Sequence, residues 1–327
     1  MRKNYSIYLW GDAEKEIGLG HLNRLRFLSQ GFKRKNISFK IITKSNHLSK
    51  SLIKKNVFFL KNNIKYFVKS MKIPSILQEE KKGIKIIFID SYSINKNFIS
   101  KLKEKNFKIV YFNDFKKNIN ANLNICLGSN IKKKNYISGF NYVPLSKEFL
   151  KTKKNSLNKK TVLITFGALD HYNLSLKLVK RLSKYDLKII VIIGKYYNRN
   201  IYRTLVKQKT KKIKIIDQPK NLFRYLKNSD TVICAGGFTV FESLSLGIPT
   251  LCIELWKNQS ANLVELKRNK LIKYINYHAK KSLQLNQSNL DVLFDKKYRA
   301  YISKRSKKII SRKGSINILK ETIKRLQ

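Results

Sequence analysis

A glycine-rich segment that ends in a histidine stands near the start of the chain, directly after a short apolar run. It contains Gly18, Gly20 and His21, with Asp12 before it and Arg24 after it. Glycine lets a backbone turn tightly and approach a ligand, and a helix beginning here would offer free N–H groups to an anion. A histidine at that place can take a proton from water. We expect His21 to be a catalytic base and the other four residues to bind substrate; a capping or packing histidine is the alternative.

A second glycine turn follows the strand-like run 231–235. Gly236, Gly237 and Thr239 lead into a predicted helix, and small residues at a helix N-terminus suit a diphosphate. Glu242 lies just over one turn into that helix, where its carboxylate can accept hydrogen bonds from both hydroxyls of a ribose. The pattern predicts a nucleotide-binding site, and the alternative is a glycine hinge beside a surface glutamate.

Three further segments place polar or small residues where predicted strands end. The side-chain amides of Asn258 and Gln259 suit neutral sugar groups and phosphate oxygens. Tyr92 stands where it can touch a substrate, although an ordinary amphipathic aromatic would look the same. Gly167 either allows a ligand to approach closely or makes a plain turn. We count these four residues among the expected substrate-binding residues.

Strand-like runs alternate with amphipathic helical segments in two successive blocks, and these elements must position the residues above. The alternation predicts parallel sheets made of right-handed β-α-β units, whose ligands bind at the carboxyl ends of the strands. We expect an α/β protein with two Rossmann-like domains, residues 1–155 and 156–327, facing across a cleft. The helical tail 297–327 is expected to close the second domain, with an RNA-binding arm as the alternative. The expected strands are 5–10, 38–43, 85–90, 108–112, 122–126, 161–166, 187–193, 212–217, 231–235 and 249–253.

The composition is strongly basic, with 71 Lys and Arg against 19 Asp and Glu among 327 residues, a formal net charge of +52. The basic residues are spread along the whole length, so we favour a solvated basic surface over a nucleic-acid site. No apolar run approaches the roughly 18 residues that a membrane helix needs. The three cysteines lack metal-ligand spacing and are expected to be reduced. We expect a cytoplasmic monomer that needs no cofactor or metal.

Three segments in this order resemble the UDP-sugar hydrolases of pseudaminic acid biosynthesis. That family is related to the SpsG-type surface-polysaccharide proteins and to the MurG-like glycosyltransferases of the GT-B fold. The similarity extends from about residue 5 to about residue 270. The segments that carry it are Ile17-Gly18-Leu19-Gly20-His21-Leu22-Asn23-Arg24, Gly236-Gly237 with Glu242, and Asn258-Gln259.

The resemblance implies a reaction in which water attacks the anomeric carbon of UDP-2,4-diacetamido-2,4,6-trideoxy-β-L-altropyranose, with inversion and release of UDP. It implies that His21 deprotonates the water and that Tyr92 belongs to the family's Asp-x-Tyr segment. Glu242 then matches the ribose-binding glutamate, and Asn258 matches an asparagine near the sugar and the diphosphate. The diphosphate is a stable anion, so its departure needs no general acid.

The chain departs from the family pattern mainly in the block expected to recognise the sugar. It has Asn113-Asp114 where the family has a paired Asp-Asp, and Gly167-Ala168 where the family has Gly-Gly. Two other functions stay open beside the hydrolase. One is a glycosyltransferase on the same scaffold, with an acceptor hydroxyl in place of water. The other is a non-catalytic protein that binds polyanions through its charge.

Overall fold

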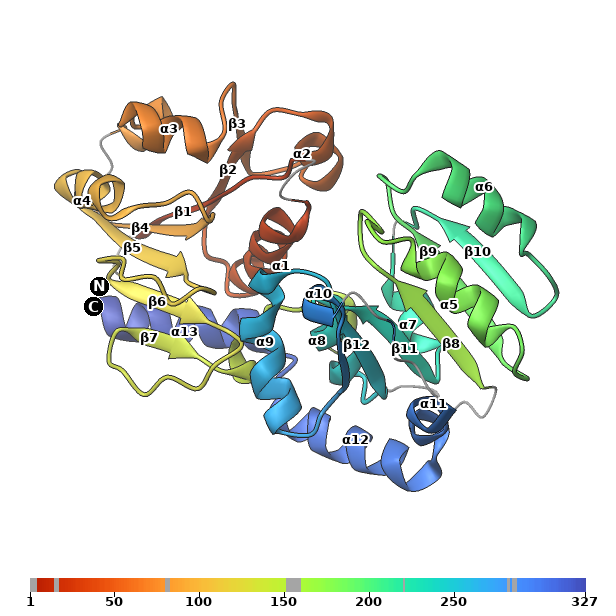
Figure 1. Ribbon diagram of the computed structural model, residues 1–327. Coiled ribbons are helices and arrows are strands. Elements are labelled where there is room, and N and C mark those ends of the chain that lie inside the picture. The colour runs from red at the N-terminus through yellow and green to blue at the C-terminus, as the bar shows by residue number, and fades with distance from the viewer. Residues whose placement is uncertain are drawn as a thin grey trace. The chain divides into compact units, whose positions relative to one another are not determined.

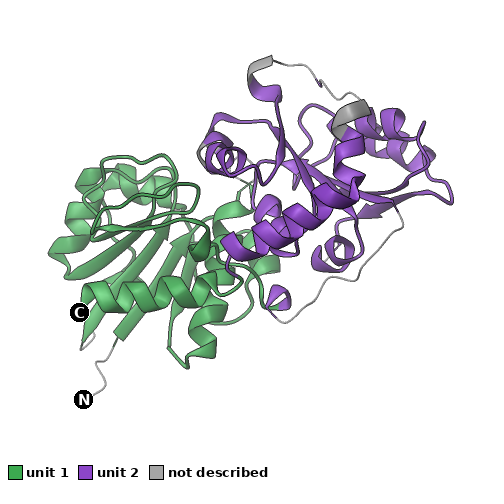
Figure 2. Cartoon of the chain, turned by 90° about the horizontal axis from the view of Figure 1, so that it is seen from below, with its two compact units in different colours: residues 1–147, 312–327 green, residues 148–311 purple. Residues whose placement is uncertain are grey.

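The chain forms two compact units, each with its own parallel β-sheet and covering helices (Figures 1 and 2). Unit 1 contains residues 1–147 and 312–327, and unit 2 contains residues 148–311. The structure is a computed structural model, which describes residues 5–14, 18–79, 83–150, 160–219, 221–280, 283 and 287–327. Within these residues the prediction of an α/β protein with two Rossmann-like parallel sheets is confirmed.

Unit 1 holds a seven-stranded sheet in the order β3-β2-β1-β4-β5-β6-β7, in which every pair is parallel. Its strands are β1 (Tyr5–Gly11), β2 (Lys40–Lys44), β3 (Val57–Leu60), β4 (Ile84–Asp90), β5 (Phe107–Phe112), β6 (Leu123–Cys126) and β7 (Tyr136–Ser138). Its helices are α1 (Gly20–Arg34), α2 (His47–Leu52), α3 (Ile64–Ser70), α4 (Lys96–Glu104) and α13 (Gly314–Leu326).

The central strands of unit 1 are buried on both faces, as their continuous apolar runs predict. Trp10 of β1 packs against Phe67 of α3 and Phe98 of α4 on one face. On the opposite face Phe88 of β4 packs against Phe32 of α1. All five rings are buried, so the carboxyl ends of β1 and β4 are held by large aromatic contacts from both sides.

Unit 2 holds a six-stranded parallel sheet in the order β10-β9-β8-β11-β12-β13. Its strands are β8 (Thr161–Thr165), β9 (Lys188–Ile193), β10 (Ile213–Asp217), β11 (Thr231–Ala235), β12 (Thr250–Glu254) and β13 (Lys273–Asn276). Its helices are α5 (Leu174–Leu182), α6 (Arg199–Lys207), α7 (Phe223–Lys227), α8 (Thr239–Ser245), α9 (Lys257–Arg268), α10 (Tyr277–Lys280), α11 (Gln287–Phe294) and α12 (Lys296–Ile309).

The tail corrects the expected domain division, because its two helices belong to different units. Helix α12 lies in unit 2, whereas α13 lies in unit 1 and packs along α1. There the hydroxyl of Ser315 donates to the backbone oxygen of Phe27 at 3.0 Å. Sequence periodicity identifies an amphipathic helix but not the sheet that it covers. The expected border between residues 155 and 156 falls outside the described residues.

Three short strands, β3, β7 and β13, were not expected from the sequence. β3 and β13 are four residues long and β7 is three, and all three lie at the ends of their sheets. The fourth end strand, β10, has five residues and was expected. Runs of only three or four residues do not stand out from a loop.

Substitution of Gly31 by Ala tests the contact between α1 and α13. A Cβ atom at Gly31 would stand 2.7 Å from Cβ of Ser315. Ala favours a helix over Gly by about 1 kcal/mol, but overpacking costs roughly 1–3 kcal/mol, so we expect a net loss in the free energy of unfolding. Urea denaturation measures it. Gly20→Ala in the same helix is the control, because a Cβ there meets nothing within 4 Å; equal stabilities of the two variants would contradict the tight helix contact.

Candidate active site

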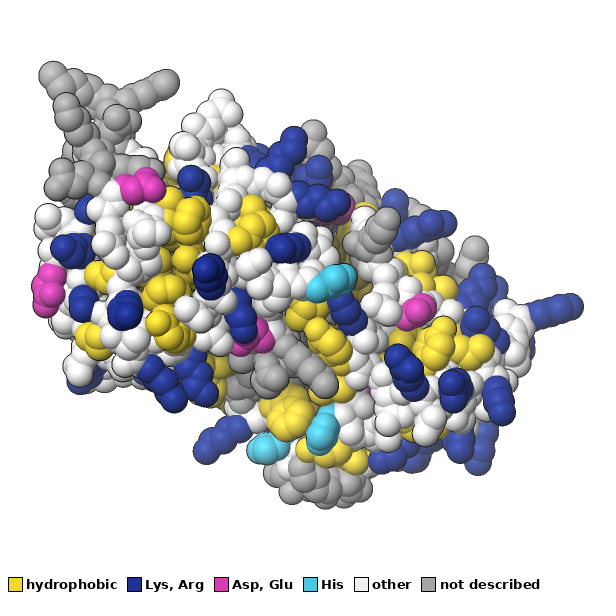
Figure 3. Space-filling model, turned by 90° about the horizontal axis from the view of Figure 1, so that it is seen from above, with side chains coloured by type: hydrophobic (Ala, Val, Ile, Leu, Met, Phe, Trp, Pro, Cys, Tyr) yellow, Lys and Arg dark blue, Asp and Glu magenta, His cyan; other side chains and the backbone are white. Residues whose placement is uncertain are grey.

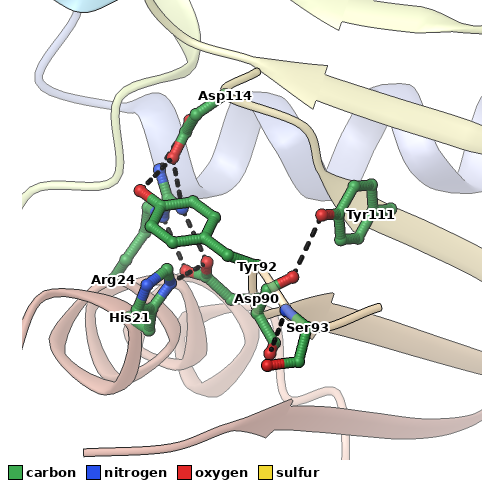
Figure 4. A network of polar contacts seen from close by, with 8 residues as sticks. His21, Arg24, Asp90, Tyr92, Ser93, Tyr111 and Asp114 are labelled. Atoms are coloured by element: carbon green, nitrogen blue, oxygen red, sulfur yellow. Dashed lines mark hydrogen bonds and ion pairs between the residues drawn. The ribbon is translucent and has the colours of Figure 1, made fainter. Parts of the chain in front are cut away.

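The parallel order β1-β4-β5 brings three loops to one edge of the sheet in unit 1. His21 stands in the first turn of α1, after β1; Asp90 ends β4, and Asp114 follows β5. These residues are up to 93 positions apart in the chain (114 − 21), yet their side chains form one network (Figure 4). Parallel strands meet at their carboxyl ends, which is where ligands bind in open α/β sheets.

The imidazole of His21 is held by the carboxylate of Asp90. Nδ1 of His21 lies 2.5 Å from Oδ1 of Asp90, and both residues are buried. Burial by itself raises the pKa of Asp90, but the charges and hydrogen bonds of Arg24 and His21 outweigh it and lower the pKa from 3.8 to about 2. An ionised carboxylate only accepts hydrogen bonds, so Nδ1 carries the proton. In the neutral ring Nε2 is then the atom that can accept a proton.

Arg24 bridges Asp90 and Asp114 with four hydrogen bonds. Nε and Nη2 donate to the two oxygens of Asp90, each at 2.6 Å, and Nη1 and Nη2 donate to Asp114 at 3.0 and 2.9 Å. The guanidinium also lies 4.4 Å above the ring of Phe112. A planar guanidinium can bind two carboxylates in this way and a lysine cannot. The sequence predicts Arg24 as a substrate-binding residue. In the structure its side chain instead holds the carboxylates of Asp90 and Asp114 in position.

Two aromatic side chains stand beside the network. The ring of Tyr92 meets that of His21 edge to face at 4.5 Å, and its hydroxyl donates to Asp114 at 3.3 Å. Phe115 packs on Tyr92 at 4.8 Å and is 43% exposed. His21 thus has a carboxylate on one side and an aromatic surface close by, the environment of a positioned proton acceptor.

The first loop is held in place by Asp12, whose carboxylate binds the backbone of two other segments of unit 1. Its two oxygens accept the backbone N–H groups of Lys44 at 3.0 Å and Ile64 at 2.6 Å, and burial raises the pKa of its carboxyl. Gly18 adopts a φ of +73°, which a residue with a side chain rarely takes. Gly20 faces open space. The structure therefore brings His21, Arg24 and Tyr92 together, whereas Asp12 makes its hydrogen bonds at the end of β2 and at the start of α3.

The glycine turn of unit 2 follows β11 and is packed closely against α9. A Cβ at Gly236 would stand 2.6 Å from Leu263 and 2.9 Å from Gln259, whereas Gly237 faces open space. The backbone can pass close to α9 only because Gly236 has no side chain. Thr239 begins α8 and Glu242 is buried in its first turn. The predicted nucleotide residues of this segment therefore lie in the glycine turn and in the first turn of the helix that follows it.

Two neighbouring loops complete this edge of unit 2. Gln259 accepts the backbone N–H of Leu255 through Oε1 at 2.9 Å, which ties α9 to the end of β12. Gly167, after β8, has a φ of +77° and faces open space. Asn258 lies in the first turn of α9, but its side chain falls outside the described part of the structure. Gln259 thus has a structural hydrogen bond that the sequence pattern did not predict.

Asp90 and Asp114 are members of the network that sequence analysis did not count among the site residues. Asp90 ends β4 and Asp114 follows the neighbouring β5, so two acids at the ends of successive apolar runs were the available signal. Among the described residues no three His, Cys, Asp or Glu side chains form a group that could hold a metal ion. In the same part of the chain, no helix combines the length and apolar character that crossing a membrane requires.

Comparison with known proteins finds one matching family model and relatives that are similar over about three quarters of the chain. The family model of the glycosyltransferase family 28 C-terminal domain matches residues 161–320. The uncharacterized protein MJ1062 of Methanocaldococcus jannaschii is 30% identical over 76% of this chain, and the match spans about half, 55%, of that protein. The spore coat polysaccharide biosynthesis protein SpsG of Bacillus subtilis is 23% identical over 78% of this chain and 79% of its own length.

Solved structures with the same fold cover the whole chain. MurG of Acinetobacter baumannii has a TM-score of 0.66 at 11% identity, over 98% of this chain and 99% of its own. The UDP-GlcNAc 2-epimerase of Neisseria meningitidis, bound to UDP-GlcNAc, has a TM-score of 0.63 at 11% identity, over 98% and 100%. The chain therefore has the GT-B fold, with a second half similar to the family 28 glycosyltransferase domain.

Substitution of Asp90 by Asn should lower stability and reduce its dependence on acid. The pKa of Asp90 is lowered on folding, so its carboxylate contributes stability above pH 4 that is lost as the pH falls toward 2. That contribution is about 2 kcal/mol and is absent in Asp90→Asn. Urea unfolding between pH 2 and pH 6 measures it. Asp186→Asn, in an exposed pair with Lys212, is the control and should change little; an unchanged acid profile in Asp90→Asn would refute the ionised state of Asp90.

Proposed function

We propose that the chain is a nucleotide-sugar enzyme in which unit 2 binds the nucleoside diphosphate and His21 of unit 1 acts at the anomeric carbon of the sugar. The observation that carries the proposal is the buried His21–Asp90 pair, held at 2.5 Å at the carboxyl edge of a Rossmann-like sheet. The GT-B fold and the family 28 match over residues 161–320 support the nucleotide half of the proposal. A neighbour of the same fold is bound to UDP-GlcNAc.

The proposed reaction is hydrolysis with inversion. Nε2 of His21 takes a proton from a water molecule whose oxygen forms a bond to the anomeric carbon, while the bond from that carbon to the diphosphate oxygen breaks. Asp90 stabilises the imidazolium that forms and keeps its orientation. The electron pair of the broken bond leaves with UDP, which is a stable anion and needs no proton. The proton on His21 then returns to solvent.

We base the assignment of the nucleotide-binding residues on the turn after β11. We assign the diphosphate to Gly236, Gly237 and Thr239, because the open backbone at Gly237 allows an anion to approach. We assign the ribose hydroxyls to Glu242, which is buried one turn further on. The resemblance to the pseudaminic-acid hydrolases suggests a diacetamido-trideoxy sugar as the group released, and Asn258 and Gly167 as residues near it.

A glycosyltransferase is the second candidate, because MurG shares the fold and family 28 is a glycosyltransferase family. In that case the same nitrogen of His21 would deprotonate an acceptor hydroxyl in place of water. The two activities differ in one measurable way. A hydrolase releases UDP from a UDP-sugar without any acceptor, whereas a transferase needs the acceptor.

A polyanion-binding protein is the third candidate, and one feature of unit 1 favours it. Lys and Arg side chains are scattered over the face in Figure 3, and Lys132, Lys133, Lys134 and Arg325 line a cavity of about 480 Å³. Binding of this kind would weaken steeply with salt and would not respond to UDP.

Replacement of His21 by Ala should abolish turnover without weakening nucleotide binding. We expect UDP release from the UDP-sugar to fall by about 10²–10⁴-fold, the usual contribution of a general base. The affinity for UDP should stay within twofold, because His21 lies in unit 1. His47→Ala, at the start of α2 in the same unit, is the matched control and should keep full activity. Turnover by His21→Ala at the wild-type rate would exclude this residue as the base.

Replacement of Glu242 by Gln should show the opposite pattern. Loss of the carboxylate removes a charge-assisted acceptor for ribose hydroxyls, which contributes about 1.5–3 kcal/mol, so we expect UDP to bind about 10- to 100-fold more weakly. Calorimetric titration with UDP and with 2′-deoxy-UDP measures it, since wild type should discriminate between them and Glu242→Gln should not. Unchanged discrimination would place the ribose elsewhere.

A further inference from the structure

Unit 2 carries an exposed aromatic cluster that the nucleotide residues do not include. Trp256, directly before α9, is 42% exposed. Its ring lies 5.4 Å from that of His171 and 6.1 Å from that of Tyr172, and Tyr172 packs on Tyr277 at 5.0 Å. His171 and Tyr172 follow β8 and Trp256 follows β12, while the buried Tyr277 begins α10 directly after β13. Three strand ends therefore contribute to the aromatic cluster, whose accessible rings are those of His171, Tyr172 and Trp256.

The aromatic cluster borders the turn to which we assign the diphosphate. In the sheet β11 lies between β8 and β12, so the loops that carry His171 and Trp256 flank the glycine turn after β11. Gly236 is packed against Gln259, which stands three residues after Trp256 in the first turn of α9. Glu242 lies on the other helix of this edge, α8. The diphosphate turn therefore has the ribose candidate on one helix and the aromatic cluster at the start of the other.

The aromatic cluster suits the sugar end of a nucleotide sugar better than the nucleotide end. The C–H face of a hexose ring and the methyl groups of acetamido or deoxy substituents are apolar, and an exposed indole gains free energy when it covers them. The edge of His171 adds a hydrogen-bonding group for hydroxyls or amides beside that surface. Binding sites for small molecules combine apolar and aromatic walls with a few polar groups in this way.

We propose that Trp256, with Tyr172 and His171, forms the sugar-binding wall of the donor site and selects hexoses that carry apolar N-acyl or deoxy substituents. This inference rests on the proposed nucleotide site and adds a specificity-determining residue to it. In this proposal the nucleobase does not occupy the aromatic cluster. The ribose is assigned to α8, and the sugar is attached to the opposite end of the diphosphate.

The test compares affinities for UDP, UDP-glucose and UDP-N-acetylglucosamine by calorimetric titration. Trp256→Ala should weaken binding of UDP-N-acetylglucosamine about tenfold, weaken UDP-glucose less, and leave UDP within twofold. Trp256→Phe should recover most of the affinity, since an aromatic face is restored. Tyr301→Ala is the matched control, because Tyr301 is an aromatic residue of α12 with 40% exposure, and it should change none of the three affinities.

The outcomes separate this inference from the proposed function. If wild type binds UDP and Trp256→Ala binds UDP-N-acetylglucosamine as well as wild type does, the sugar wall is wrong and the nucleotide site stands. Equal weakening of UDP and of both UDP-sugars would assign the aromatic cluster to the nucleobase and overturn the inference. A wild-type protein that binds none of the three would overturn the nucleotide site and the inference together.

Discussion

The guanidinium of Arg24 between two buried carboxylates is the interaction on which the geometry around His21 depends. Asp90 and Asp114 end neighbouring strands and would repel each other or take up protons without a cation between them. Arg24 donates to both of them, so Asp90 stays ionised and can hold the Nδ1–H of His21. Removal of one partner from a buried ion pair costs about 3–5 kcal/mol, so we expect the network to stabilise unit 1 in addition to its role in the proposed site.

Each unit uses the same kind of hydrogen bonding to hold a loop at the carboxyl edge of its own sheet. In each unit a buried aspartate follows the first strand along the chain, β1 or β8, and accepts two backbone N–H groups. Asp12 binds Lys44 and Ile64 in unit 1, and Asp170 binds Leu174 and Ser175 at the start of α5 in unit 2. Burial raises the pKa of both acids. Loops braced in this way keep candidate ligand groups in fixed positions, as a preorganised site requires.

Much of the fold could be predicted from the sequence, because buried parallel strands such as β9 and β11 are continuous apolar runs. The edge strands β3, β7 and β13 were missed because they are only three or four residues long. The location of α13 could not be predicted, since an amphipathic pattern does not identify the sheet that it covers.

Sequence analysis could single out His21 and Gly236 because their residue types indicate a chemistry or a backbone conformation by themselves. The roles of Asp90, Asp114 and Arg24 in the network depend on strand order. Strand order brings residues from three loops together, and no local sequence pattern contains it. For Asp12 and Gln259 the sequence motif predicts substrate binding, whereas in the structure both side chains make hydrogen bonds to the backbone.

The central claim is that Asp90 holds the Nδ1–H tautomer of His21 and leaves Nε2 as the proton acceptor. Nitrogen-15 NMR of protein labelled in histidine measures this directly, with His21→Ala identifying the resonances. At a pH where the ring is neutral, the account predicts a proton on Nδ1 and none on Nε2. A neutral ring with its proton on Nε2 would contradict the account, because the atom assigned to receive the proton from water would already carry one.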